Sequence, residues 1–325
     1  MNIIEHGRML AVQQLFTTNG FNSSWPTWKI EIQRLFHNPT SPTNQEILDI
    51  GDWLRDIFRT TGQAGRSQSD VSGGGSSWEA LVCWYLNLCT SNRRTLVIKH
   101  NKKLIPKAVN EAITVNYGNF RSNTESDLIA ITFPDRPEYC MDKNNIRITN
   151  SHHQLIPTYK PTIRNPNPPY NYLEILNALV ERDFNDIEIH IIQCKTNWND
   201  NAQIPMLWDA IYSANNFRNG ISVGTNGRSI HNINRFTYSF VTVPSNQLTK
   251  QNGSPTYGIQ STPVLRVANL SGGNYWGRPS QQGVASSIKE LVSRNLSSGS
   301  IPNALTTIAS TIPLLTTSYN YFDLI

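Results

Sequence analysis

Charged residues and cysteines are both scarce in this sequence. Aspartate, glutamate, lysine and arginine supply only 16% of its 325 residues, whereas they supply about a quarter of a typical soluble protein. The cysteines are too few for a dense disulfide framework and form no CxxC pair of the kind that binds zinc; they are Cys83, Cys89, Cys140 and Cys194. We therefore expect buried thiols in a reducing compartment.

Long apolar runs are absent as well. No stretch approaches the roughly 20 apolar residues that are needed to cross a bilayer. The N-terminal segment carries an acid at Glu5 and lacks the apolar core of a signal peptide. We expect a soluble, cytoplasmic protein without a membrane partner.

The polarity that is present comes mostly from asparagine, serine and threonine, together with a small excess of basic residues. The 28 lysines and arginines outnumber the 23 acids, which gives a formal charge of +5. A basic protein suits a polyanionic partner. Many cytosolic proteins are mildly basic, however, so the charge alone identifies no partner.

Helical and extended patterns alternate along the chain. Apolar residues at helical spacing predict helices over residues 5–18, 44–61, 78–89, 106–113, 172–182, 205–215 and 284–296. Short apolar runs predict strands over 95–98, 128–133, 187–194, 237–243 and 263–267. Stretches rich in proline, glycine or asparagine predict loops around Trp25-Pro26 and over 62–77, 151–170 and 197–201. The loop 62–77 is either a flexible surface loop or a segment that orders on a ligand.

The mixture of strands and helices indicates an α/β or α+β fold. No internal repeat and no sharp break in composition marks a linker, so we expect a single domain over residues 1–325. Residues 1–75 would be its mainly helical part.

The predicted strand 187–194 ends in a distinctive group of side chains. Because side chains alternate along a strand, Gln193 and Lys195 point to one face and Cys194 points to the other. The nearly continuous isoleucines before them indicate a strand that is buried on both sides. Lys195 would therefore lie at the rim of the core, where it is partly desolvated.

A second strand, 128–133, is preceded by the acid Asp127. A carboxylate beside a strand-end lysine is what metal-assisted phosphodiester hydrolysis needs. The carboxylate holds Mg²⁺, which polarises the phosphate and lowers the pKa of a bound water. The lysine orients that water and stabilises charge on the phosphate.

An acid that opens one strand, followed by (Asp/Glu)-x-Lys on the next, resembles the PD-(D/E)XK nuclease superfamily, and in particular type II restriction endonucleases of prokaryotic cells. Ser126-Asp127 stands at the PD position and Gln193-Cys194-Lys195 at the (D/E)XK position. The resemblance implies a mixed central sheet flanked by helices, a restriction-endonuclease-like core over residues 76–215, and a DNA-recognition and dimerisation elaboration over 216–325. It also implies Mg²⁺ as cofactor, double-stranded DNA as substrate and a homodimer. Its motifs are short and degenerate.

The sequence departs from the family pattern at Gln193, which can coordinate Mg²⁺ through its amide oxygen but adds no negative charge. The resemblance suggests Glu79 as the missing carboxylate, since a glutamate on the helix before the first strand often lies near the metal site. Glu125 is the next candidate. A structural role for Glu79 competes with this one, because Ser76-x-x-Glu79 fits a helix capping box.

Other motifs point to other chemistry. Residues 220–224 match GxSxG, the serine nucleophile elbow, but that elbow needs a strand before Ser222 and a helix after it, and neither is predicted. His152-His153 has no further metal-ligating residue at suitable spacing, so these are interpreted as loop histidines. Glu188 lies on the strand face opposite Gln193 and Lys195, and it is left out of the predicted site.

Two groups of residues are candidates for DNA contacts. The densest basic group would bind phosphates; it consists of Arg93, Arg94, Lys99, Lys102 and Lys103. An Asn- and Arg-rich stretch over 215–235, and a second one at 274–278, would read bases; their candidates are Asn216, Arg218, Asn226, Arg228, Arg235 and Arg278. A solvated surface and ordinary turns are the alternative interpretations.

The sequence therefore predicts a Mg²⁺-dependent, sequence-specific endonuclease that acts on double-stranded DNA. Its predicted catalytic residues are Asp127, Gln193, Lys195 and Glu79. Asp127, Gln193 and Glu79 are also the predicted metal ligands. Two alternatives stay open. One is a DNA-binding protein that keeps the nuclease fold with weak or no catalysis, because Gln193 lacks the acid charge. The other is a structure-specific repair nuclease.

Overall fold

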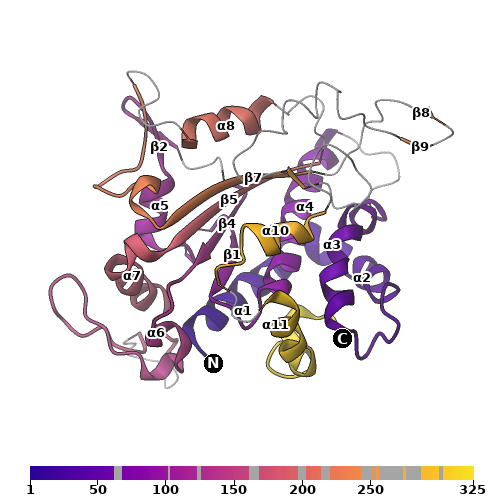
Figure 1. The fold of residues 1–325 in the computed structure, drawn as a ribbon, viewed down its shortest axis with the longest axis horizontal. Coiled ribbons are helices and arrows are strands. Elements are labelled where there is room, and N and C mark those ends of the chain that lie inside the picture. Colours follow the sequence, from indigo (N-terminus) through magenta and orange to yellow (C-terminus); the bar gives the residue numbers. More distant parts are fainter. Residues whose placement is uncertain are drawn as a thin grey trace.

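The computed structural model describes residues 1–61, 68–101, 103–122, 126–160, 168–196, 203–213, 220–242, 250–251, 254–255, 274–275, 287–299 and 303–325. These residues form a mixed α/β fold in which helices lie on both faces of a central sheet (Figure 1). The predicted α/β class with a mixed sheet flanked by helices is thus confirmed. None of the described helices is both long and apolar enough to cross a membrane.

Within the described residues, the central sheet has five strands in the order β1-β4-β5-β7-β10. The first three strands are antiparallel neighbours, and β7 and β10 run parallel to β5. Their bounds are β1 Thr95–Lys99, β4 Leu128–Thr132, β5 Glu188–Lys195, β7 Arg235–Thr242 and β10 Asn274–Tyr275. The sequence predicted the first four of these strands; the predicted strand 263–267 lies outside the described residues.

Two smaller sheets accompany the central one. A three-stranded sheet has the order β3-β2-β6, and β8 pairs with β9. Their bounds are β2 Val115–Tyr117, β3 Phe120–Ser122, β6 Ile221–Val223, β8 Lys250–Gln251 and β9 Ser254–Pro255.

Helices cover the two faces of the central sheet. In Figure 1, α2, α3, α4, α10 and α11 lie on one side of the sheet, and α5, α6, α7 and α8 lie on the other. Their bounds are α1 Ile3–Phe16, α2 Asn19–Gln33, α3 Asn44–Arg59, α4 Gln68–Cys89, α5 Lys107–Ile113, α6 Pro137–Cys140, α7 Tyr172–Arg182, α8 Gln203–Ser213, α10 Lys289–Arg294 and α11 Ala304–Thr311. Short 3-10 helices span Lys143–Asn145, Phe184–Asp186, Ile230–Asn232, Ile312–Leu314 and Asn320–Phe322.

The central strands are buried on both sides, as the isoleucine-rich sequence predicted. Alternate residues of β5 belong to two different core clusters: Ile192 and Cys194 pack on the α4 side, whereas Ile189 and Ile191 pack on the α5 and α7 side. The period-2 alternation of a strand therefore divides one apolar run between two cores.

The loop predicted around Trp25-Pro26 is wrong, because Pro26 lies inside helix α2. The helix buries Phe21, Trp25 and Trp28 in the core on the α4 side, and Trp25 lies 4.8 Å from Trp84 between ring centroids. Burial of three large aromatic side chains outweighs the backbone hydrogen bond that proline cannot donate.

The loop predicted over 62–77 is also wrong for its second part. Helix α4 begins at Gln68 and runs through the glycine-rich stretch, although each glycine disfavours a helix by about 1 kcal/mol relative to alanine. Trp78 and the residues that follow it are buried, and extending an established helix needs only one further hydrogen bond per residue. Residues 62–67 lie outside the described residues. The long segment 151–170 has no helix or strand in its described parts, as predicted.

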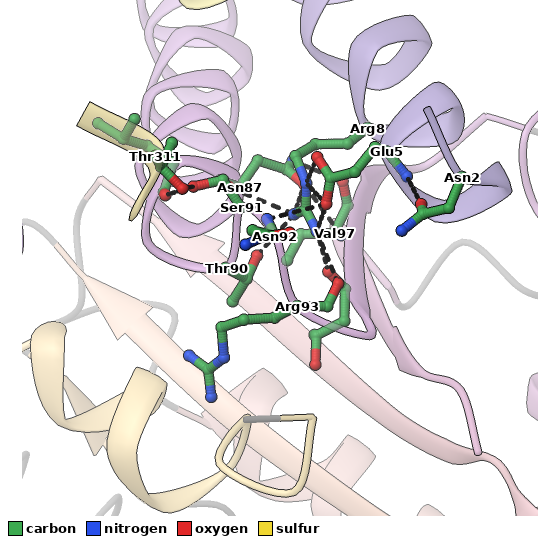
Figure 2. Close-up of polar contacts among 12 residues, drawn as sticks. Asn2, Glu5, Arg8, Asn87, Thr90, Ser91, Asn92, Arg93, Val97 and Thr311 are labelled. Atoms are coloured by element: carbon green, nitrogen blue, oxygen red, sulfur yellow. Dashed lines mark hydrogen bonds and ion pairs between the residues drawn. The ribbon is translucent and has the colours of Figure 1, made fainter. Parts of the chain in front are cut away.

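A buried cation joins α1 to α4 and β1 (Figure 2). The guanidinium of Arg8 has no exposed surface, and it forms an ion pair with Glu5 at 3.1 Å. It also donates hydrogen bonds to the hydroxyl of Thr90 at 2.8 Å and to the backbone carbonyl of Thr95 at 2.8 Å. Because Thr90 follows the end of α4 and Thr95 begins β1, this network fixes the turn between these two elements.

Candidate functional site

Three strand ends meet at one end of the central sheet. In the register of the sheet, Lys99 at the end of β1 is paired with Leu128, and Leu128 is paired with Ile192 of β5. Because β4 runs opposite to both neighbours, its first residues lie beside the last residues of β1 and β5. Helix α4 packs across β1 and β5. This topology brings Asp127, Lys99 and Lys195 to the same end of the sheet.

Asp127 connects two of these strand ends. Its Oδ2 atom accepts a hydrogen bond from the backbone N–H of Cys194 at 2.7 Å, and it lies 4.0 Å from Nζ of Lys195. The two side chains keep 16% and 27% of their surface exposed, respectively. The carboxylate and the lysine that the sequence pattern pairs therefore lie next to each other.

Glu79 faces the site from α4. Its Oε2 atom lies 3.3 Å from Nζ of Lys99, and Lys99 also donates to the backbone carbonyl of Ser76 at 2.8 Å. Since α4 begins at Gln68, Ser76 lies within the helix rather than at its N-terminus. The capping-box interpretation of Ser76 and Glu79 is therefore wrong.

Burial and mutual repulsion act on the two carboxyl groups. Burial raises the pKa of Glu79, the charge of Asp127 raises it further, and Lys99 and Lys195 oppose these effects. Burial also raises the pKa of Asp127, against the lowering effects of Lys195 and of the Cys194 N–H. A cation bound nearby would stabilise the ionised form of both carboxyls and would oppose the effect of burial on their pKa values.

The site offers few ligands for a divalent metal. Among the described residues, no group of three or more His, Cys, Asp and Glu side chains could hold a metal ion. Glu79 and Asp127 are two carboxylates, and Glu125 lies outside the described residues. Mg²⁺ usually keeps several waters and binds through one or two carboxylates together with substrate phosphates. These two oxygen ligands fit such a magnesium site and do not fit an enclosed, all-protein metal site.

Gln193 is more deeply placed than the other predicted site residues. It is 4% exposed, and its Oε1 atom accepts a hydrogen bond from the hydroxyl of Tyr238. Tyr238 belongs to the core on the α5 and α7 side, whereas Cys194 belongs to the core on the α4 side. Gln193 and Cys194 thus occupy opposite faces, as the strand alternation predicted.

Sequence reasoning missed two neighbours of the site, His100 and Tyr238. His100 donates its backbone N–H to the carbonyl of Asp127 at 3.1 Å, and its Nδ1 atom lies 3.2 Å from Oγ of Ser126. Tyr238 contacts Gln193 from β7. His100 belongs to the basic run that the sequence singled out, but nothing in the sequence indicates that it pairs with Ser126.

The residues predicted to contact phosphates lie in different parts of the structure. Arg93 is 4% exposed and donates to the backbone carbonyl of Leu296 at 2.8 Å, and burial lowers the pKa of its guanidinium to about 10. The prediction of a phosphate contact is therefore wrong for Arg93, because its charge does not reach the surface. Arg94 lies 3.8 Å from Asp135, at the opposite end of β1 from Lys99. Lys103 is exposed, and Lys102 lies outside the described residues.

The described candidates for base contacts in the Asn- and Arg-rich stretch form hydrogen bonds or ion pairs within the protein. Asn226 donates to Oε1 of Glu111 at 2.7 Å. Arg228 forms an ion pair with Glu181. Arg235 lies 3.9 Å from Glu188 and donates to the backbone carbonyl of Arg294 at 3.2 Å. Three further candidates lie outside the described residues: Asn216, Arg218 and Arg278.

The competing motifs do not form sites. Ser222 is the middle residue of β6 and pairs with Asn116 of β2, so it does not occupy a turn between a strand and a helix. His152 and His153 are exposed in the long loop. Glu188 begins β5, at the strand end opposite Lys195.

Comparison with known proteins gives no family for this chain. No protein-family model matches it, and no curated protein matches its sequence. The candidate site therefore rests on its own geometry.

Proposed function

We propose that this protein is a Mg²⁺-dependent endonuclease of the PD-(D/E)XK type that hydrolyses phosphodiester bonds of double-stranded DNA. The observation that carries the proposal is the placement of Asp127 against Lys195 at neighbouring strand ends, 4.0 Å apart, with Glu79 facing them from α4. An acid opening one strand, a lysine ending the next, and a glutamate on the preceding helix are the parts that the sequence resemblance implies. The mixed sheet flanked by helices supports the same proposal.

Asp127 and Glu79 would hold the magnesium ion. When bound, the ion supplies a Lewis acid that polarises the phosphate and acidifies a coordinated water. Burial raises the pKa of both carboxyls, and the charge of Asp127 raises that of Glu79 further, so the site would gain from binding a cation. Hard carboxylate oxygens are the ligands that Mg²⁺ prefers.

Lys195 would act on the substrate. Its ammonium group is 27% exposed and lies at the rim of the core beside Asp127, so it can reach a phosphate oxygen or an attacking water. A fixed positive charge in a partly desolvated position stabilises negative charge that develops on the phosphate. Lys99 would keep Glu79 in place through its ion pair.

The finer proposal is a sequence-specific restriction enzyme that acts as a cytoplasmic homodimer. An isologous dimer would match the two-fold symmetry of a palindromic DNA site. A DNA-binding protein with little or no catalysis is the second candidate. It is favoured by one observation: Gln193 is neutral and its amide oxygen already bonds Tyr238. A structure-specific repair nuclease is the third.

Incubation of phage DNA with the protein separates these candidates. A restriction enzyme should give discrete bands with Mg²⁺ and none with EDTA, a repair nuclease should cut branched or damaged DNA instead, and a binding protein should shift DNA without cutting it. The matched control is Ser222→Ala, which should leave the digest unchanged. DNA that stays intact with Mg²⁺ under all these conditions would contradict the proposal.

A further inference from the structure

Gln193 lies on β5 between two polar contacts, the Asp127 carboxylate on the backbone of Cys194 and the hydroxyl of Tyr238 on its own amide. Asp127 directly precedes β4, one residue before the pair Leu128–Ile192, and its carboxylate accepts a hydrogen bond from the backbone N–H of Cys194, the residue after Gln193. On the other side, Tyr238 of β7 is paired with Ile191, two residues before Gln193 on the same strand face. Gln193 and Tyr238 therefore share one face of the sheet, and the Asp127 carboxylate lies beside the strand end that carries Gln193.

The tyrosine ring is held firmly. Tyr238 has no exposed surface and stacks on Tyr212 with 5.8 Å between ring centroids. The hydroxyl of Tyr212 in turn donates to the backbone carbonyl of Ile113 at 3.1 Å, which ties the pair to α5. Close packing on all sides leaves the hydroxyl of Tyr238 with a fixed direction.

The hydroxyl of Tyr238 contacts the oxygen of the Gln193 amide. It donates to Oε1 of Gln193. The oxygen and nitrogen of an amide diverge from the same carbon, and the nitrogen only donates hydrogen bonds. With the oxygen turned toward β7, the Nε2 group of Gln193 turns away from Tyr238.

We propose that Tyr238 is a positioning residue that keeps the oxygen of Gln193 away from the metal, so that Gln193 offers N–H groups and is not a metal ligand. This inference rests on the proposed function. The magnesium ion would then be held by Asp127 and Glu79, with waters and phosphate oxygens completing its shell. The N–H groups of Gln193 suit an anionic neighbour, either the Asp127 carboxylate or a phosphate oxygen.

Two carboxylates at the site face the two lysines Lys99 and Lys195, and Gln193 adds no charge. Metal binding without DNA should therefore be weak and should tighten when DNA phosphates supply further oxygens. A glutamate at position 193 would keep one oxygen on Tyr238 and place a second oxygen where Nε2 now lies, which would add a third ligand.

Binding of Mn²⁺, measured by electron paramagnetic resonance on the full-length protein, tests the inference without any cleavage assay. The ligand variant Asp127→Asn should weaken Mn²⁺ binding by at least about tenfold. Gln193→Met, which removes the amide at similar volume, should weaken binding less than Asp127→Asn does, since it removes no direct metal bond. Tyr238→Phe should leave the Kd unchanged or lower it, because the amide oxygen becomes free to turn. Gln193→Glu should lower it.

The Mn²⁺ affinities of these variants distinguish a failure of the inference about Gln193 from a failure of the proposed function. If Gln193→Met weakens Mn²⁺ binding as much as Asp127→Asn does, or if Tyr238→Phe weakens it, Gln193 is a ligand and the inference is overturned while the metal site stands. If the wild-type protein binds no Mn²⁺, with or without DNA, the proposed function itself fails and the inference fails with it. Circular dichroism melts of each variant exclude misfolding as the cause of a loss.

Discussion

Two carboxylates and two lysines set the chemistry of the site at the scale of single residues. Lys195 lies beside Asp127, and Lys99 pairs with Glu79. Burial raises the pKa of both carboxyls despite these cations. The ionised carboxylates are thus less stable in the folded protein than they would be in water. Such a cost is common where charged groups are gathered for binding.

The raised pKa values predict how pH and magnesium affect stability. Because the folded pKa of Glu79 and of Asp127 lies above the unfolded value, the folded protein binds protons more tightly there. The contribution of these groups to stability is therefore greatest below the unfolded pKa and falls as the pH rises through the folded pKa. Mg²⁺ binds the ionised carboxylates, so it should raise the Tm more at pH 8 than at pH 5.

Thermal melts with and without Mg²⁺ at the two pH values check this prediction. At a metal concentration of about 100 times the Kd, the gain at pH 8 should be about 2.7 kcal/mol. The double variant Glu79→Gln and Asp127→Asn is the control and should show no dependence on Mg²⁺. An equal rise at both pH values, or a rise that persists in the double variant, would place the metal elsewhere.

At the scale of elements, the Arg8 network holds α1 against the junction of α4 and β1. Arg8→Met removes the cation and leaves Glu5 buried without its ion-pair partner. Breaking one half of a buried ion pair commonly costs about 3–5 kcal/mol. We expect a loss of that size in the free energy of unfolding, measured with urea.

Arg34→Met is the matched control for this experiment. Arg34 also pairs with a glutamate three residues away, Glu31, but its side chain is 68% exposed. Exposed pairs of this kind contribute only about 0.2–1 kcal/mol. Similar losses for the two variants would mean that the Arg8 network contributes no more than an ordinary surface pair.

Helix α2 offers a test of a different kind. Pro26 is exposed in the interior of this helix, where proline donates no backbone hydrogen bond and crowds the preceding turn. Pro26→Ala should therefore raise the free energy of unfolding by about 1–2 kcal/mol, which is the helix gain of about 3 kcal/mol reduced by the freedom that the unfolded chain regains. Denaturant titration measures the change, and a destabilised variant would show that proline fits this helix without strain.

At the scale of the whole molecule, the sequence predicted the central strands, and the family resemblance implied that Asp127 meets Lys195. The strands could be predicted because strand alternation and apolar runs are local signals. Glu79 was expected through the family resemblance. The sequence could not predict α2 and the first part of α4, since tertiary burial there outweighs proline and glycine.

The contacts of the candidate site residues were harder to predict than the fold. Arg93 belongs to a basic run in the sequence, but its backbone turns it into the core, where Leu296 accepts its hydrogen bond. Tyr238 and His100 reach the site from other strands, and no local pattern indicates their partners. Such contacts depend on how distant segments assemble, and a single sequence carries no record of that.

The most direct test of the account is the single-turnover cleavage rate of Lys195→Ala on DNA that the wild-type protein cuts. Lys107→Ala is the control, because that lysine is 78% exposed and lies on α5. We expect Lys195→Ala to lower the rate by at least about a hundredfold, with DNA binding retained, and the control to cleave at the wild-type rate. Cleavage by Lys195→Ala at the wild-type rate would contradict the assignment of the site.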